Sequence, residues 1–365
     1  MSTANAESQS PMGAIPNFDE DKLNQLVEKI ITDYGACLST ALVYIGERLG
    51  IYKAMADGKG YTSQSLSEKT GLNERYLREW LLNQAAGGYI EYDPESKQYS
   101  LNAEQTLALA KDETPFYLAG GVYVAKALFG STERIMNAFL NGGGMLWGEH
   151  DPELFKGTEQ FFRAGYQAYL VANWIPALKG VKEKLEAGGV VADVGCGHGA
   201  STLIMAETFP NSRFYGFDNH LPSIEYAQKK ARESGLTNIE FIAVDAGSIP
   251  DNSYDLICFF DCLHDMGDPL SAMKRAYQTL KSDGSCMIVE PMAGNNVEDN
   301  LNPVGRIFSA ASTLCCTSNS LALGGPALGA VASEQELEKY VKGGGFTSFE
   351  RVSETISNRI FEARK

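Results

Sequence analysis

The sequence predicts an α/β fold built on a doubly wound parallel sheet, with a mostly helical domain before it. From residue 186 to the C-terminus, apolar β-forming runs alternate with helical segments, and acidic side chains end several of the runs. Strands and helices that alternate at these lengths are typical of a parallel sheet with helices on both faces. Such sheets bind ligands beyond the carboxyl ends of their strands, where these acidic side chains are expected.

A glycine-rich turn follows the first predicted strand, residues 190–194. It reads Gly195-Cys196-Gly197-His198-Gly199, and a helix over 200–209 comes next. Glycine lets a backbone approach a ligand closely and adopt dihedral angles that a Cβ forbids. The third glycine comes one residue earlier than in the G-x-G-x-x-G pattern of hydride-transferring cofactors. This spacing disfavours a nicotinamide-dependent oxidoreductase, which stays open as an alternative.

The same turn, with Asp193 before Gly195, resembles motif I (D/E-x-G-x-G-x-G) of the class I S-adenosylmethionine (SAM) methyltransferases. The resemblance implies that SAM is the cofactor and that the catalytic domain, residues 186–365, has their Rossmann-like sheet. It also implies that Asp193, Gly195, Gly197 and Gly199 form the pocket near the amino-acid end of SAM.

Acidic residues also end the second and third predicted strands. Asp218 follows the apolar run 214–217, and a carboxylate at that place commonly accepts hydrogen bonds from both hydroxyls of a ribose. The alternative is an N-cap for the helix expected over 219–230. In the methyltransferases, the residues matching Asp245 and Ala246 contact the adenine, although Asp245 could also cap a loop. The predicted cofactor site further includes Asn219 and Phe260.

The fourth strand, residues 254–260, is a near-continuous apolar run that suits a strand covered on both faces. It leads into Leu263-His264-Asp265, with Gly267 and Asp268 following. This segment resembles the L-H-D-W-x-D segment of the caffeate and acetylserotonin O-methyltransferases, whose histidine is the general base that takes the acceptor's proton. Met266 stands here in place of their tryptophan, so the packing behind the loop is altered.

The resemblance implies that Glu290, at the end of the fifth strand (286–290), orients His264. An unperturbed imidazole titrates near ~6.5, which suits a base at working pH. Glu290 or Asp265 would fix the tautomer of His264 and stabilise its imidazolium form. The alternative is a histidine that only caps the next helix or packs under a loop.

Composition fits an enzyme of two domains. The chain has 365 residues, of which 44% are hydrophobic, and a formal net charge of −15. An acidic surface disfavours nucleic acid as a partner. The seven cysteines show no metal-ligand spacing, so we expect no metal, reduced thiols and a cytoplasmic location. No signal-peptide or membrane-spanning run is apparent, so no membrane partner is expected, and residues 1–17 are predicted to be a disordered tail.

Residues 18–110 predict a winged helix-turn-helix. A helix, a turn with Gly71, a helix over 73–86 and a hairpin follow one another. DNA-reading helices carry a basic stripe, but two glutamates cancel the two arginines of the 73–86 helix. In the O-methyltransferases named above, this domain forms a dimer interface and closes the partner's active site. The resemblance therefore implies a homodimer, while a SAM-sensing transcriptional regulator remains the alternative.

Two segments are expected to enclose the cleft. The mostly helical residues 111–185, here called the roof, place Tyr166 and Tyr169 near the methionine end of SAM if the relatives' architecture holds; ordinary core packing is the alternative. Residues 291–332, here called the insert, form the acceptor wall, because so long a segment at the edge of a sheet is usually functional. Its first half, 304–314, is predicted to be helical.

The whole order, over about residues 20–362, resembles the winged-helix class I methyltransferases found in bacteria and some eukaryotes. Segments 42–50 and 324–329 look like recurrent segments of that group. The resemblance implies methyl transfer from SAM to a small molecule by in-line displacement. A hydroxyl or thiol acceptor would need His264 as base, whereas a sulfide or tertiary amine would not. The acceptor itself is left open.

Overall fold

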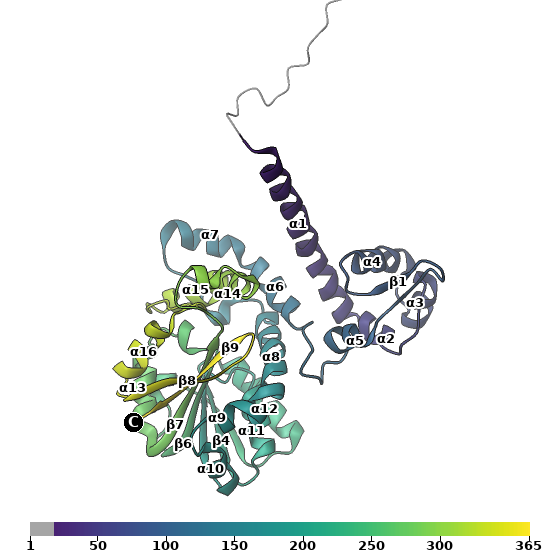
Figure 1. The fold of residues 1–365 in the computed structure, drawn as a ribbon. Coiled ribbons are helices and arrows are strands. Elements are labelled where there is room, and N and C mark those ends of the chain that lie inside the picture. Colours follow the sequence, from purple (N-terminus) through teal and green to yellow (C-terminus); the bar gives the residue numbers. More distant parts are fainter. Residues whose placement is uncertain (1–17) are drawn as a thin grey trace, which may run out of the picture.

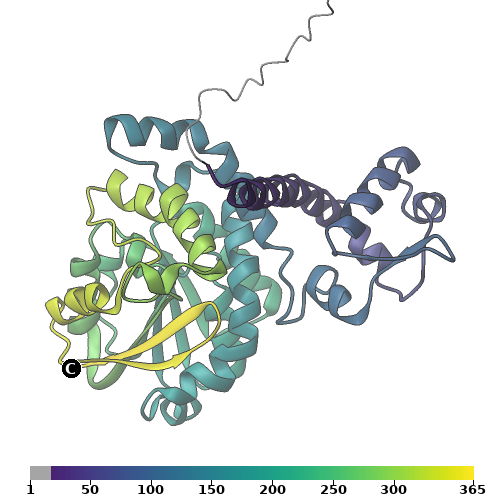
Figure 2. The same ribbon diagram turned by 45° about the horizontal axis from the view of Figure 1, so that its top comes forward.

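The computed structural model describes residues 18–365, so the tail predicted for residues 1–17 lies outside the described residues. The first element is the long helix α1 (Glu20–Arg48), which begins where the Asp19 carboxylate accepts a hydrogen bond from the amide of Lys22 at 3.1 Å. It ends just before Gly50, which adopts the left-handed φ of 69° that stops a helix. Figures 1 and 2 show α1 between the small N-terminal domain and the α/β domain.

The N-terminal domain is the predicted winged helix-turn-helix. Asn73 caps the second helix of the motif by accepting from the amide of Arg75, and Gly71 turns the chain between the two helices at φ 72°. A short antiparallel hairpin follows and forms the wing. The elements are α2 (Ile51–Met55), α3 (Ser63–Thr70), α4 (Glu74–Ala86), β1 (Glu91–Asp93), β2 (Gln98–Ser100) and α5 (Ala103–Leu109).

The roof is helical, as predicted, and is tied to α1. The Tyr44 hydroxyl donates to the Glu153 carboxylate at 2.7 Å, and the Arg48 guanidinium lies 3.7 Å from the same group. The last long element of the roof is π-helical, which the sequence did not predict. The elements are α6 (Gly121–Gly130), α7 (Thr132–Asn141), η1 (Trp147–Glu149), α8 (Glu153–Gly165), the π-helix η2 (Tyr166–Trp174), α9 (Ile175–Ala177) and α10 (Val181–Ala187).

A seven-stranded sheet forms the centre of the described α/β domain, in the order β5-β4-β3-β6-β7-β9-β8. The predicted parallel strands are β3 (Val190–Val194), β4 (Arg213–Asp218), β5 (Ile239–Ala243), β6 (Tyr254–Phe260) and β7 (Leu280–Pro291). The prediction of a parallel sheet holds for these five strands only. A C-terminal hairpin, β8 (Ser348–Glu354) and β9 (Asn358–Arg364), adds two antiparallel strands that the sequence did not predict.

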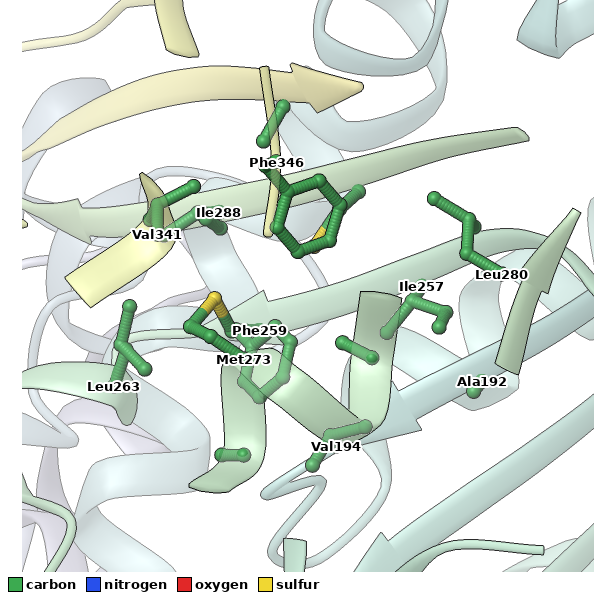
Figure 3. Packing of buried hydrophobic residues seen from close by; sticks show 14 of the residues in the cluster. Ala192, Val194, Ile257, Phe259, Leu263, Met273, Leu280, Ile288, Val341 and Phe346 are labelled. Atoms are coloured by element: carbon green, nitrogen blue, oxygen red, sulfur yellow. The ribbon is translucent and has the colours of Figure 1, made fainter. Parts of the chain in front are cut away.

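Alternate side chains of the central strand β6 enter two different cores. Ile257 and Phe259 pack with Met273 and Val341 on one face, and Figure 3 shows this core. Leu256, Cys258 and Phe260 pack against the roof and α11 on the other face. The near-continuous apolar run thus reflects burial on both sides. The covering helices are α11 (Ala200–Thr208), α12 (Leu221–Ser234), α13 (Pro269–Thr279) and α16 (Glu334–Gly343).

The insert folds over the carboxyl end of the sheet and locks onto the roof. The amide of Met145 donates to the Ser318 hydroxyl at 2.7 Å, and the amide of Trp147 donates to the Asn319 side chain at 2.8 Å. Figures 1 and 2 show its helices beside α7. Its elements are η5 (Glu298–Asn300), α14 (Pro303–Ala311), the π-helix η6 (Ser312–Cys316) and α15 (Thr317–Ala322). None of the helices within residues 18–365 combines the length and the apolarity needed to cross a membrane.

Replacing Gly144 with alanine is expected to destabilise the contact between roof and insert. The added Cβ would lie 1.9 Å from the backbone oxygen of Ser318, which a side-chain rotation cannot relieve. Overpacking of this kind costs about 1–3 kcal/mol, so thermal denaturation should show a Tm lower by a few degrees. Gly130→Ala, at the exposed end of α6 with no atom within 4 Å, is the control and should keep or raise the Tm. An unchanged Tm for Gly144→Ala would contradict the described contact.

Candidate active site

A cavity of about 860 Å³ opens at the carboxyl ends of the parallel strands. It lies where the sheet order reverses, because β4 and β5 extend to one side of β3 and β6 lies on the other. Open α/β sheets bind ligands at such a point. The predicted site residues that line the cavity are Tyr166, Gly195, Gly197, Asp218, Asn219, Asp245, Ala246, Phe260, His264 and Asp265.

The glycine-rich turn after β3 brings bare backbone to the cavity. Gly195, Gly197 and Gly199 all have positive φ, and a Cβ on Gly197 would project into open space. Gly199 instead fits closely over the ring of Phe241, 2.5 Å from where its Cβ would be, so it supports the turn from behind. The turn therefore offers a ligand an unobstructed surface at Gly197, whereas Gly195 makes room for the side chain of Cys262, 2.6 Å from where its own Cβ would be.

Asp193 lies beneath this turn, fully buried. Its Oδ2 accepts from the hydroxyls of Ser201 and Thr202, both at 2.6 Å, while Oδ1 has no hydrogen-bond partner within the described part of the chain. Burial raises the pKa of Asp193 to about 6, against the lowering effect of the two hydroxyls. A buried, half-satisfied carboxylate of this kind is unusual in a purely structural role.

The other two strand-end acids face the cavity. Asp218 accepts from the backbone amide of Gly197 at 2.9 Å and from that of His220 at 2.8 Å, so it also ties the glycine turn to β4. Burial raises its pKa. The Asn219 amide donates to Asp245 at 3.3 Å, and Ala246 follows on the short helix η3 (Ala246–Ser248). The carboxylates of Asp218, at the end of β4, and Asp245, just after β5, thus lie along one wall of the cavity.

His264, on the short helix η4 (Leu263–Asp265), forms a buried pair with Glu290. Its Nδ1 lies 2.5 Å from Glu290 Oε2, and the other oxygen, Oε1, accepts from the amide of Leu263 at 3.1 Å. Only 3% of His264 and 1% of Glu290 is exposed. Burial lowers the pKa of His264, but the Glu290 carboxylate and the Cys316 thiol raise it, and the net direction is well above its usual value.

The loop that carries His264 is held by the insert. The Asn319 amide donates to the carbonyl oxygen of Asp265 at 3.0 Å, and the Ser320 hydroxyl donates to that of Met266 at 2.8 Å. The carbonyl oxygen of His264 accepts from the amide of Gly329 at 3.1 Å. The insert therefore fixes the backbone that carries His264 and also forms one wall of the cavity.

Tyr166 and Tyr169 differ in their placement. Tyr166 lines the cavity and its hydroxyl lies 3.3 Å from Asp261, whereas Tyr169 is 41% exposed, stacks on Trp174 and is absent from the lining. The π-helix begins at Tyr166, so its wider turns shift the side chains that follow away from the positions expected for an α-helix. Residue spacing alone could not reveal this shift.

Asp261, Cys315 and Cys316 are among the cavity residues that were not predicted as part of the site. Asp261 adopts a positive φ of 52°, and its carboxylate accepts from the Asn358 amide at 2.7 Å. Burial raises its pKa well above the usual value. Cys315 and Cys316 line the cavity from the π-helix η6. The sequence signal available for Asp261 was its position at the end of β6, but the two cysteines carried none.

Comparison with known proteins identifies both domains. Residues 185–344 match the family model described as a methyltransferase domain, and residues 36–111 match the one described as an Rv2258c-like winged HTH domain. The chain therefore combines a methyltransferase domain with a winged helix-turn-helix domain, and this confirms the resemblance seen in the sequence.

Curated relatives match part of the chain. One is (S)-coclaurine N-methyltransferase from Thalictrum flavum subsp. glaucum, 28% identical over 28% of this chain and 29% of the relative. Another is demethylmenaquinone methyltransferase from Geobacillus sp., 28% identical over 29% of this chain and 47% of the relative. The chain thus spans less than half the length of these two relatives.

Solved structures match nearly the whole fold. Human N-acetylserotonin methyltransferase in complex with SAM superposes with a TM-score of 0.70 at 16% identity, covering 93% of this chain and 97% of that chain. An O-methyltransferase family protein from Burkholderia thailandensis gives a TM-score of 0.67 at 15% identity, covering 96% and 98%. At these identities the likeness establishes the fold.

The Asp193→Asn variant is expected to change how stability depends on pH. Because the folded pKa of Asp193 is raised from 3.8 to about 6, its contribution to stability is fully present below the unfolded pKa and is lost as pH rises through about 6. The Tm of Asp193→Asn minus the Tm of the wild type, measured on the ligand-free protein, should therefore increase from about pH 4 to about pH 8. If the two Tm values run parallel over this pH range, the pKa of Asp193 is not raised in the folded protein.

Proposed function

We propose that the protein transfers a methyl group from SAM to a hydroxyl or thiol of a small molecule. The observation that carries this proposal is the His264–Glu290 pair, whose histidine lines the same cavity as the glycine turn and the strand-end acids. A cofactor site and a candidate base would therefore share one cavity. A sulfide or amine acceptor would use the same cofactor site and would need no base.

The residues fit SAM. The open space above Gly197 admits close backbone contact, and the unpartnered Oδ1 of Asp193 lies beneath the turn that would hold the amino-acid end. Asp218 would accept from the ribose hydroxyls, while Asp245 and Ala246 would flank the adenine. When bound, SAM supplies an electrophilic methyl group on a sulfonium leaving group.

The chain's own contribution is alignment, exclusion of water and removal of a proton. Since Nδ1 of His264 faces Glu290, Nε2 is the nitrogen left to accept the proton of an acceptor hydroxyl or thiol. Glu290 holds the ring and stabilises the imidazolium that forms. The acceptor's oxygen or sulfur then gains a bond to the methyl carbon as the bond from that carbon to the cofactor's sulfur breaks.

We further propose that the protein is a homodimer that does not bind nucleic acid. Apolar side chains of α1 are exposed over several turns, namely Leu23, Leu26, Val27, Ile30, Ile31, Tyr34 and Leu38, and a second copy could cover them. On α4, where a DNA reader would need free cations, Arg75 pairs with Glu79 and Arg78 pairs with Glu74. These pairs favour the enzyme over a SAM-sensing regulator.

His264→Ala is expected to lower kcat for a hydroxyl or thiol acceptor by about 10²–10⁴-fold, because general-base catalysis contributes that much. The affinity for SAM, measured by calorimetry, should stay nearly the same, which separates a lost base from a disrupted fold. A retained kcat would remove His264 from the base role.

The pH profile gives a further test of the pair. The raised pKa of His264 means that the neutral, basic form accumulates only on the alkaline side, so kcat should rise with pH above neutrality. Glu290→Gln removes the negative charge that raises this pKa, so the rising limb should move to lower pH. If kcat of Glu290→Gln rises over the same pH range as kcat of the wild type, Glu290 does not control the protonation of His264.

Asp218→Ala is expected to weaken SAM binding several-fold or more, because the ribose would lose its carboxylate acceptor. Calorimetry with SAM measures the loss, and NAD serves as the negative ligand for the wild-type protein. Glu240→Ala, on the neighbouring strand β5 and outside the cavity lining, is the matched control. Equal affinities for Asp218→Ala and Glu240→Ala would refute the ribose assignment.

A further inference from the structure

Apart from the histidines, every charged side chain that lines the cavity is acidic. Within residues 18–365, no lysine or arginine lines the cavity. Its charged lining consists of the acidic residues Glu149, Glu159, Asp218, Asp245, Asp261, Asp265 and Asp268. Of the lining histidines, His264 has a raised pKa, but it is already paired with Glu290. A bound anion would therefore find no unpaired cation among the described lining residues and would lose its hydration without compensation.

Six of these seven acids already have partners. Glu149 lies 2.8 Å from Arg134 and Glu159 lies 3.4 Å from Arg163, both outside the lining. The other four engaged carboxylates accept hydrogen bonds: Asp218 from backbone amides, Asp245 from Asn219, Asp261 from Asn358, and Asp268 from the amide of Ser271 at the start of α13. The carboxylate of Asp265 accepts none from any described residue other than its own backbone.

The surroundings of Asp265 disfavour a bare negative charge. Burial is the main reason that its pKa rises to about 7, and the charges of Glu290 and Asp218 add to the effect. His264 opposes it, but the imidazole Nδ1 is committed to Glu290. A positively charged ligand group beside Asp265 would supply the missing counter-charge.

The rest of the acceptor space is apolar and aromatic. The roof contributes Trp147, Phe155, Phe161 and Phe162, and the insert contributes Phe308. Aromatic faces bind apolar rings and also attract cations through their π-electrons. This wall therefore suits an apolar body that carries a positive charge.

We propose that the acceptor is an apolar amine whose protonated nitrogen pairs with Asp265, and that the cavity rejects molecules bearing a carboxylate or phosphate. The inference rests on the proposed function, which places the cofactor along the glycine turn. The nitrogen is an anchor, and the hydroxyl or thiol that faces His264 receives the methyl group. Electrostatic complementarity thus selects the acceptor by its charge.

The experiment uses three probes with one phenol ring and different charges: tyramine, 4-ethylphenol and 3-(4-hydroxyphenyl)propionate. Their binding to the full chain is measured by calorimetry at saturating concentration of S-adenosylhomocysteine (SAH), the demethylated cofactor. Tyramine should bind most tightly and the propionate at least about tenfold more weakly, as expected for a charged hydrogen bond gained in one case and absent in the other. Equal affinities, or no binding of tyramine, would overturn the inference.

Two variants test the assignment of Asp265. Asp265→Asn keeps the size of the side chain and should weaken tyramine binding about tenfold, with the affinities for 4-ethylphenol and SAH unchanged. Ile307→Lys places a cation at the exposed edge of the cavity lining and should strengthen binding of the propionate. If Asp265→Asn weakens SAH but not tyramine, Asp265 serves the cofactor and the inference fails.

The two proposals fail in different ways. If the wild-type protein does not bind SAH at all, the proposed methyl transfer is refuted. If SAH binds but the three probes do not differ, only the choice of an amine is refuted.

Discussion

The contact between Glu290 and His264 is part of a buried cluster of charge that extends beyond the cavity. Glu290 pairs in register with Arg359 on β9, and Arg359 is itself fully buried. The guanidinium donates to the carbonyl oxygens of Pro291 and Ala332, both at 2.9 Å. Burial lowers the pKa of Arg359 to about 10, whereas Glu290 raises it. A buried carboxylate is tolerable here because a cation lies on one side and an imidazole on the other.

Through this cluster the C-terminal hairpin supports the candidate site. β9 supplies Arg359 opposite Glu290, and the adjacent Asn358 holds the carboxylate of Asp261. Neither residue lines the cavity, but both fix groups at its edge. The last strands of the chain therefore support the site that begins with the glycine turn after β3.

The sequence was sufficient for the features that follow from local chemistry. Acids and glycines at the ends of apolar runs predicted the cofactor wall. The pairing of His264 with Glu290 was implied by the resemblance of the Leu263-His264-Asp265 segment to the O-methyltransferases. The hairpin and its Arg359 could not be found this way, because antiparallel pairing at a sheet edge depends on tertiary contacts that composition does not encode. The placement of Tyr169 was also beyond reach, since a π-helix leaves no periodic signal that differs clearly from an α-helix.

Both walls of the cavity are helices with a π-helical stretch, η2 in the roof and η6 in the insert. Such a stretch contains more residues per turn than the α-helix around it. Loss of one residue from η6 would turn the following side chains by about 100° about the helix axis, because an α-helix advances by 3.6 residues per turn. Other residues of α15 would then point inward while the sheet stayed as it is. A short insertion or deletion at either place would therefore change the side chains that line the cavity and leave the sheet as it is.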